Sequence, residues 1–102
     1  MNQRTKGKRG ELEIVHILND FGFPARRGDC FRHEPDVMCP MLPFHWEVKR
    51  QETIKINDWW KQSVSASDED EIPTVVFRQN NQDWKLVINL TDFLELVKEA
   101  IK

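Results

Sequence analysis

The amino-acid sequence predicts a single α/β (α+β) domain in which helices flank a mixed central β-sheet. Two observations support this fold class. With 102 residues, the chain can build one hydrophobic core but not two. Its periodic apolar segments are separated by turn-forming residues and follow one another in the order α-β-β-β-α-β-β-α. That order is typical of a mixed sheet covered by helices.

The first element is predicted to be a helix over residues 8–21, which ends at Gly22. Five apolar residues fall on one arc of this helix: Ile14, Val15, Ile17, Leu18 and Phe21. Glu11 falls inside the same arc, where a carboxylate is costly unless something nearby needs a negative charge. Residues 1–7 are predicted to form a flexible, basic N-terminal arm.

Three short strands are predicted next, over residues 24–27, 36–39 and 44–50. The segment CPMLP supplies the turn between the last two strands, because proline cannot continue a hydrogen-bonded ladder. If these two strands pair, Asp36 and Glu47 can approach each other across the ladder.

The second half of the chain adds a helix over about 58–67, with Asn57 as its N-cap. Strands over 74–79 and 83–89 flank the hairpin signal NNQ. Thr91 is predicted to cap a last helix over 92–101. Five apolar residues of that helix are expected on its inner side: Phe93, Leu94, Leu96, Val97 and Ile101.

The composition, 39% apolar and 31% charged, indicates a soluble globular protein. No apolar run is long enough to cross a membrane, and the N-terminus lacks the hydrophobic segment of a signal peptide. We therefore expect a cytoplasmic protein without a membrane partner, in which Cys30 and Cys39 are reduced thiols.

The net charge of −2 hides an uneven distribution of charge along the chain. The first ten residues are basic and contain no acid, whereas DEDE at 68–71 concentrates negative charge. This sorting permits a basic, nucleic-acid-binding face on an acidic protein. A solvated N-terminal tail explains the same basic residues equally well.

The stretch WEVK at residues 46–49 carries two charges on one face of a strand, because residues i and i+2 point the same way. Glu47 and Lys49 therefore share a face, and Phe44, Trp46 and Val48 share the other. An exposed ion pair, worth under about 1 kcal/mol, is one explanation of this pattern.

The other explanation is a metal site, because Asp36 and the inward-pointing Glu11 add two more carboxylates. Carboxylates that lie close together repel strongly unless a divalent cation neutralises them. Oxygen ligands without a convergent His or Cys suit Mg²⁺ or Mn²⁺. A metal ion beside a lysine can catalyse phosphodiester hydrolysis, because the ion polarises the phosphate and activates water.

One pattern resembles the motif of the PD-(D/E)XK nuclease superfamily: "PD" at residues 35–36, then ten further residues, then "EVK" at 47–49. Glu11 stands in the position of the helical Glu of that superfamily. Within the superfamily the chain looks most like the archaeal-type Holliday junction resolvases. KGKRGELE resembles their Lys-Gly followed by the helical Glu, and DFGFPARRGD resembles their Gly-Phe, strand and Arg segment.

The resemblance implies a restriction-endonuclease-like αβββαβ core and a homodimer that cuts two opposed strands of a four-way DNA junction with Mg²⁺, or Mn²⁺ in its place. Asp36, Glu47 and the Val48 carbonyl would bind the metal ion. Lys49 would orient or activate the attacking water, and Glu11 would serve the catalytic centre. Arg27 would contact the scissile strand. No small-molecule cofactor is implied, and the cell would be prokaryotic or phage-infected.

Two features depart from those resolvases: Leu12 follows the helical Glu where they usually carry Arg, and the loop GDCFRHE before Asp36 is bulkier than theirs. Both bear on DNA handling rather than on metal binding. The alternatives are a nuclease of the same superfamily that acts on nicked, single-stranded or duplex DNA, and a non-catalytic junction-binding protein with structural carboxylates.

Other residues have both functional and structural explanations. Gln62 is a candidate auxiliary residue of the active site or a solvated side chain. Trp59 and Trp60 could stack on DNA bases or pack at a dimer interface. We predict one in the core and one at an interface, because adjacent helical positions point about 100° apart. Five basic residues are candidate phosphate contacts or ordinary surface charges: Lys6, Lys8, Arg9, Arg26 and Arg32. Four residues could form a structural zinc site or remain thiols and imidazoles: Cys30, His33, Cys39 and His45.

Overall fold

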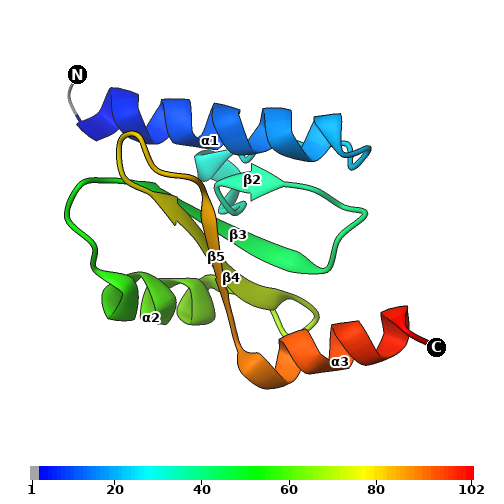
Figure 1. Ribbon diagram of the computed structural model, residues 1–102. Coiled ribbons are helices and arrows are strands. Elements are labelled where there is room, and N and C mark those ends of the chain that lie inside the picture. The colour runs from blue at the N-terminus through cyan, green and yellow to red at the C-terminus, as the bar shows by residue number, and fades with distance from the viewer. Residues whose placement is uncertain (1–2) are drawn as a thin grey trace.

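A computed structural model describes residues 3–102 as one domain with a five-stranded sheet and three α-helices (Figure 1). The elements follow the predicted order α-β-β-β-α-β-β-α, with one added 3₁₀ turn, η1. Their bounds are α1 Gln3–Asp20, β1 Arg26–Arg27, η1 Cys30–Arg32, β2 Val37–Met38, β3 Phe44–Arg50, α2 Ile56–Ala66, β4 Ile72–Arg78, β5 Lys85–Ile88 and α3 Leu90–Ala100.

The sheet is mixed, as predicted, and its spatial order is β1-β2-β3-β4-β5. β3 and β4 are parallel, and the other neighbours are antiparallel. Parallel neighbours need a crossover, and α2 supplies it between β3 and β4. The two longest strands therefore form the centre of the sheet, with β3 at its middle.

The two faces of β3 have different neighbours, because side chains alternate along a strand. Trp46 and Val48 point towards α1 and join a buried cluster with Ile14 and Leu18. Glu47 and Lys49 consequently point to the opposite face of the strand. α2 covers that face of β4, where Trp59 lies 5.9 Å from Phe77 between ring centroids.

One tryptophan of the Trp59–Trp60 pair in α2 is a core residue, as predicted. Trp59 is 4% exposed and belongs to the core, whereas Trp60 is half-buried. The Ser63 hydroxyl, also buried, donates a 2.8 Å hydrogen bond to the Thr74 carbonyl and fixes α2 against β4. A role of Trp60 at an interface remains a prediction.

The ends of the helices differ from the predicted ones. α1 begins at Gln3, so residues 3–7 of the predicted arm are helical, and Lys6 forms a 3.2 Å ion pair with Glu52. Residues 1–2 of that arm lie outside the described residues. Asn57 does not cap α2, because the helical hydrogen bonds already begin at the Lys55 carbonyl.

The last helix departs most from the prediction. Asn89, not Thr91, is the N-cap, and its side chain accepts hydrogen bonds from the N–H groups of Thr91 and Asp92. None of the α3 residues is buried, so the predicted inner side is wrong: Phe93, Leu94, Val97 and Ile101 are exposed, and Leu96 is half-buried. Figure 1 shows α3 leading away from β5 at one end of the sheet. Amphipathic periodicity predicted the helix but not a surface to cover it.

None of the helices within residues 3–102 combines the length with the apolar character that a membrane crossing requires.

Candidate active site

Asp36 and Glu47 are brought together by the pairing of β2 with β3. Val37 is the partner of Trp46 in this antiparallel pair, and continuing the register by one residue sets Asp36 opposite Glu47. One Asp36 carboxylate oxygen also accepts a 2.9 Å hydrogen bond from the Val48 N–H. The predicted approach of the two carboxylates across the ladder is therefore confirmed.

Glu47 is an unusual carboxyl group, because it is only 6% exposed. Burial, together with the negative charge of Asp36 and a hydrogen bond shared with it, raises the pKa of Glu47 to about 7. The Lys49 ammonium lies 3.8 Å from a Glu47 oxygen and lowers this pKa in part. Glu47 therefore holds its proton more strongly than an ordinary glutamate, and the charge of Lys49 offsets only part of the rise in its pKa.

Glu11 reaches the same region from α1. Its carboxylate lies 2.9 Å from the guanidinium of Arg27 in β1. Burial raises the pKa of Glu11, the hydrogen bond from Arg27 opposes the rise, and the charge of Asp36 adds to it. The charge of Lys49 also acts on the pKa of Glu11. The inward-pointing glutamate singled out in the sequence therefore lies within electrostatic reach of both residues.

Most of the predicted DNA-contacting residues are paired with acids of the same chain. Arg26 donates two 3.0 Å hydrogen bonds to Glu34, and Arg32 lies 3.7 Å from Asp29. Lys8 and Arg9 are exposed on α1, and Gln62 is exposed on α2. Among the side chains described from residue 5 onwards, the polar contacts of the Glu11–Asp36–Glu47–Lys49 site include Arg27 but none of Gln62, Lys6, Lys8 and Arg9.

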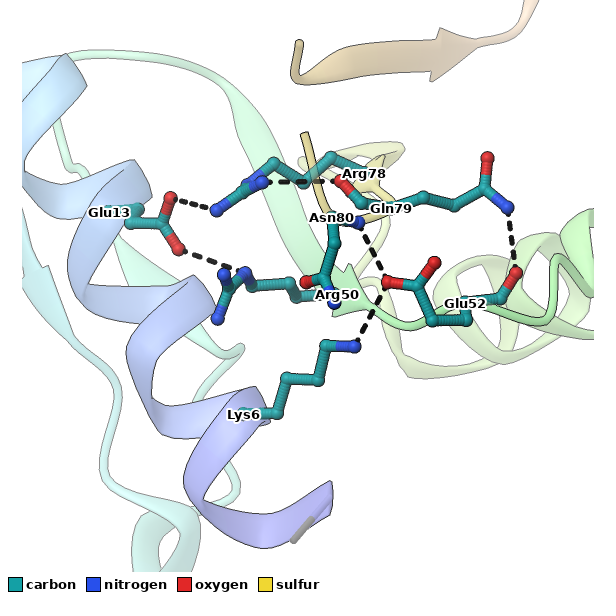
Figure 2. A network of polar contacts seen from close by, with 7 residues as sticks. All are labelled: Lys6, Glu13, Arg50, Glu52, Arg78, Gln79 and Asn80. Carbon is teal, nitrogen blue, oxygen red and sulfur yellow. Dashed lines mark hydrogen bonds and ion pairs between the residues drawn. The ribbon is translucent and has the colours of Figure 1, made fainter. Parts of the chain in front are cut away.

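A second cluster of charges was not anticipated from the sequence. Glu13 lies 2.7 Å from Arg78 and 3.3 Å from Arg50, at the carboxyl ends of β4 and β3 (Figure 2). The Arg78 guanidinium also lies 5.5 Å from the centroid of the Trp84 ring. Strand alternation predicts only that Arg50 lies on the α1 face of β3. The contacts of Glu13 with Arg50 and Arg78 join segments far apart in the sequence, so no local pattern predicts them.

The same cluster extends to the loops at that end of the sheet (Figure 2). Glu52 accepts hydrogen bonds from the Lys6 ammonium and from the Asn80 N–H, and its carbonyl accepts one from the Gln79 amide. These contacts attach the first turns of α1 to the β4–β5 turn. They therefore help to fix the position of α1, the helix that carries Glu11, relative to the sheet.

The donor atoms of the site fit a hard cation better than zinc. No group of three His, Cys, Asp or Glu residues between 3 and 102 is close enough to form a complete metal cage. Mg²⁺ commonly binds through one or two carboxylates and keeps several waters, so the Asp36–Glu47 pair suffices for it. For zinc the geometry is unfavourable: Cys30 and His33 are exposed, while Cys39 and His45 point to opposite faces of the sheet.

Comparison with known proteins agrees with this fold. The fold is similar to that of Hjc from Archaeoglobus fulgidus, a Holliday junction resolvase from an archaeal hyperthermophile. The TM-score is 0.60 at 20% sequence identity, over 78% of this chain and 73% of that chain. No curated protein matches the chain. A family model described as "Phage putative PDDEXK endonuclease" matches residues 2–102. Because this match spans nearly the whole sequence, the chain belongs to that family of phage PD-(D/E)XK endonucleases.

Proposed function

We propose that this protein is a Mg²⁺-dependent DNA endonuclease that resolves four-way junctions by paired, symmetric nicks. The observation that carries the proposal is the Asp36–Glu47 pair, in which a buried Glu47 of raised pKa lies opposite Asp36 and 3.8 Å from the Lys49 ammonium. Such a pair is stable in its ionised form only with a further positive charge, which a divalent cation supplies.

In this proposal Asp36 and Glu47 bind the cation, and the Val48 carbonyl is the third protein ligand. The N–H and C=O groups of one strand residue point to the same side, and the Val48 N–H points to Asp36. The carbonyl is therefore expected to face the same edge of β3, opposite the segment that precedes β2. The bound cation, Mg²⁺ or Mn²⁺, would polarise the scissile phosphate and lower the pKa of a water molecule.

Lys49 is proposed to hold the attacking water and to stabilise the developing negative charge on the phosphate. Glu11 is proposed to orient Arg27, through their 2.9 Å ion pair, and to accept hydrogen bonds from water at the catalytic centre. Arg27 is then available to contact a phosphate of the scissile strand. Lys6, Lys8, Arg9, Arg26 and Arg32 are proposed as phosphate contacts along the DNA.

The proposed substrate is branched DNA, and the proposed assembly is a homodimer. Similarity in fold to a Holliday junction resolvase supports both. Two opposed cuts in one junction need two active sites, and a two-fold dimer supplies them. Nicked, single-stranded or duplex DNA is the competing substrate for the same active site. The expected location is the cytoplasm of a phage-infected cell.

The decisive experiment is cleavage of a labelled four-way junction with and without Mg²⁺, beside linear duplex and single-stranded controls. Asp36→Asn keeps an oxygen that can accept the Val48 N–H but removes the charge. We expect it to lower cleavage at least about 100-fold while junction binding survives. Asp83→Asn, in the exposed β4–β5 turn, is the matched control and should cleave normally.

Three results would redirect the proposal. Metal-dependent cutting of the controls alone would keep the active site and change the substrate. Tight junction binding without metal-dependent cutting would favour a non-catalytic junction-binding protein. Unchanged cleavage by Asp36→Asn would remove the carboxylate pair from the mechanism.

A further inference from the structure

Phe31 is an exposed aromatic residue in the loop that separates two parts of the active site. The loop starts directly after Arg27, which pairs with Glu11, and ends directly before Asp36. Phe31 is 91% exposed, more than any other large apolar residue in the described part of the chain. A phenyl ring left in water at this position contributes almost nothing to the core of its own domain.

The loop that carries Phe31 is held by several hydrogen bonds. The Asp29 side chain accepts from the Phe31 N–H at 2.9 Å, and its carbonyl accepts from the N–H groups of Arg32 and Glu34. Glu34 in turn accepts from the Asp29 N–H at 2.8 Å. The Gly28 N–H donates to the Asp36 carbonyl at 2.9 Å, which attaches the base of the loop to the active site.

The loop segment around Phe31, DCFRHE at residues 29–34, is rich in charged residues. Its chain neighbours are exposed, and the Arg32 side chain is 78% exposed. Protein–protein interfaces centre on apolar patches from which charged residues are depleted, so an isolated ring among charges is a poor interface core. A single exposed aromatic ring beside an arginine is instead typical of surfaces that stack unpaired bases.

We propose that Phe31 stacks on an unpaired or unstacked nucleobase next to the scissile phosphate. The proposal rests on the proposed nuclease function and adds a base-contacting residue to it. Because the loop joins Arg27 to Asp36, a base that stacks on Phe31 belongs to a nucleotide close to the cleaved one. Intact linear duplex has no such base, whereas a branch point, a nick or a single strand does. Phe31 thereby favours DNA with a break in base stacking.

The test measures DNA binding by Asp36→Asn protein, in which cleavage is suppressed, with 2-aminopurine placed at the branch point as a fluorescent base. We expect Phe31→Ala to weaken binding to single-stranded and branched DNA by roughly 5- to 150-fold. Binding to blunt linear duplex should not change. The change in 2-aminopurine fluorescence on binding should be lost with Phe31→Ala, retained with Phe31→Trp, and lost with Phe31→Leu, which is apolar but cannot stack.

Phe21→Ala is the matched control, because Phe21 is another exposed phenylalanine, in the turn after α1. It should bind every DNA like the parent protein. Equal weakening on all three DNAs, or none, would overturn the stacking proposal and leave the nuclease assignment intact. A fall in molecular mass on Phe31→Ala, measured by sedimentation without DNA, would instead assign the ring to a contact between two copies. Failure of the parent protein to bind any DNA would overturn the proposed function itself.

Discussion

Asp36 and Glu47 face each other across the β2–β3 pair, one residue before Val37, where β2 begins. One Asp36 oxygen accepts a hydrogen bond from the Val48 N–H, whereas Glu47 is buried beside it and has a pKa of about 7. The closeness of the two carboxyl groups disfavours ionising both in the metal-free protein, and the same closeness favours binding of a cation between them.

The free energy of unfolding of the metal-free protein should fall as the pH rises from about 4.5 to about 7. In this window the folded chain keeps a proton at Glu47 that the unfolded chain, with a carboxyl pKa near 4.5, has already lost. Each pKa unit corresponds to about 1.4 kcal/mol, so the total loss is about 3 kcal/mol.

Urea denaturation between pH 5 and pH 8, in the presence of a chelator, measures this slope. Glu47→Gln should flatten it, and Mg²⁺ should restore stability to the parent protein above pH 7 but not to the variant. Parallel pH profiles for the two proteins would show that Glu47 does not titrate as described.

Gly28→Ala should damage both stability and activity, because a Cβ at Gly28 would overlap the backbone carbonyl of Pro35. Relief of this clash requires the chain to move next to Asp36. We expect a loss of about 1–3 kcal/mol in the free energy of unfolding and a fall of roughly 100-fold in cleavage. Thermal unfolding and a junction cleavage assay measure the two effects.

Gly7→Ala is the control, since a Cβ there meets nothing within 4 Å and Gly7 lies inside α1. It should raise the free energy of unfolding by up to about 1 kcal/mol. If the two alanine variants behave alike, the close approach at Gly28 is not a constraint on the active-site loop.

Glu13→Gln should destabilise the attachment of α1 to the sheet. It removes the charge that pairs with Arg50 and Arg78, whose side chains are only 14% and 13% exposed. Glu13 itself is 36% exposed, so water screens part of the effect and we expect about 1–2 kcal/mol. Glu99→Gln breaks the exposed Glu99–Lys102 pair and should cost under about 0.5 kcal/mol. Urea denaturation of the two variants side by side checks the difference, and equal effects would contradict it.

Substitutions on the apolar side of α3 should barely affect the stability of a single copy of the chain. Phe93 and Leu94 are 46% and 53% exposed, so their replacement by alanine should change the free energy of unfolding by under about 1 kcal/mol. Ile14→Ala, in the core cluster, should cost about 2–5 kcal/mol. Denaturation at low protein concentration is the measurement, and a loss as large as that of Ile14→Ala would mean that another surface covers α3.

The order of elements and the residues of β3 could be predicted from the sequence, because periodicity and turn chemistry are local properties. Strand alternation alone put Glu47 and Lys49 on one face of β3. The short turn before β3 made pairing with Asp36 the natural expectation, and the register bears this out. Those local rules were therefore sufficient to find the carboxylates of the candidate site.

Only the tertiary structure decided which partners these residues meet. The Glu11–Arg27 ion pair and the attachment of Glu13 to two arginines join segments from different parts of the chain, and no local pattern predicts such contacts. For α3 the local pattern is clear, but it did not predict the environment of the helix: no α3 residue is buried by the described part of the chain. Periodicity determines which side of a helix is apolar, but the path of the whole chain determines what lies against that side.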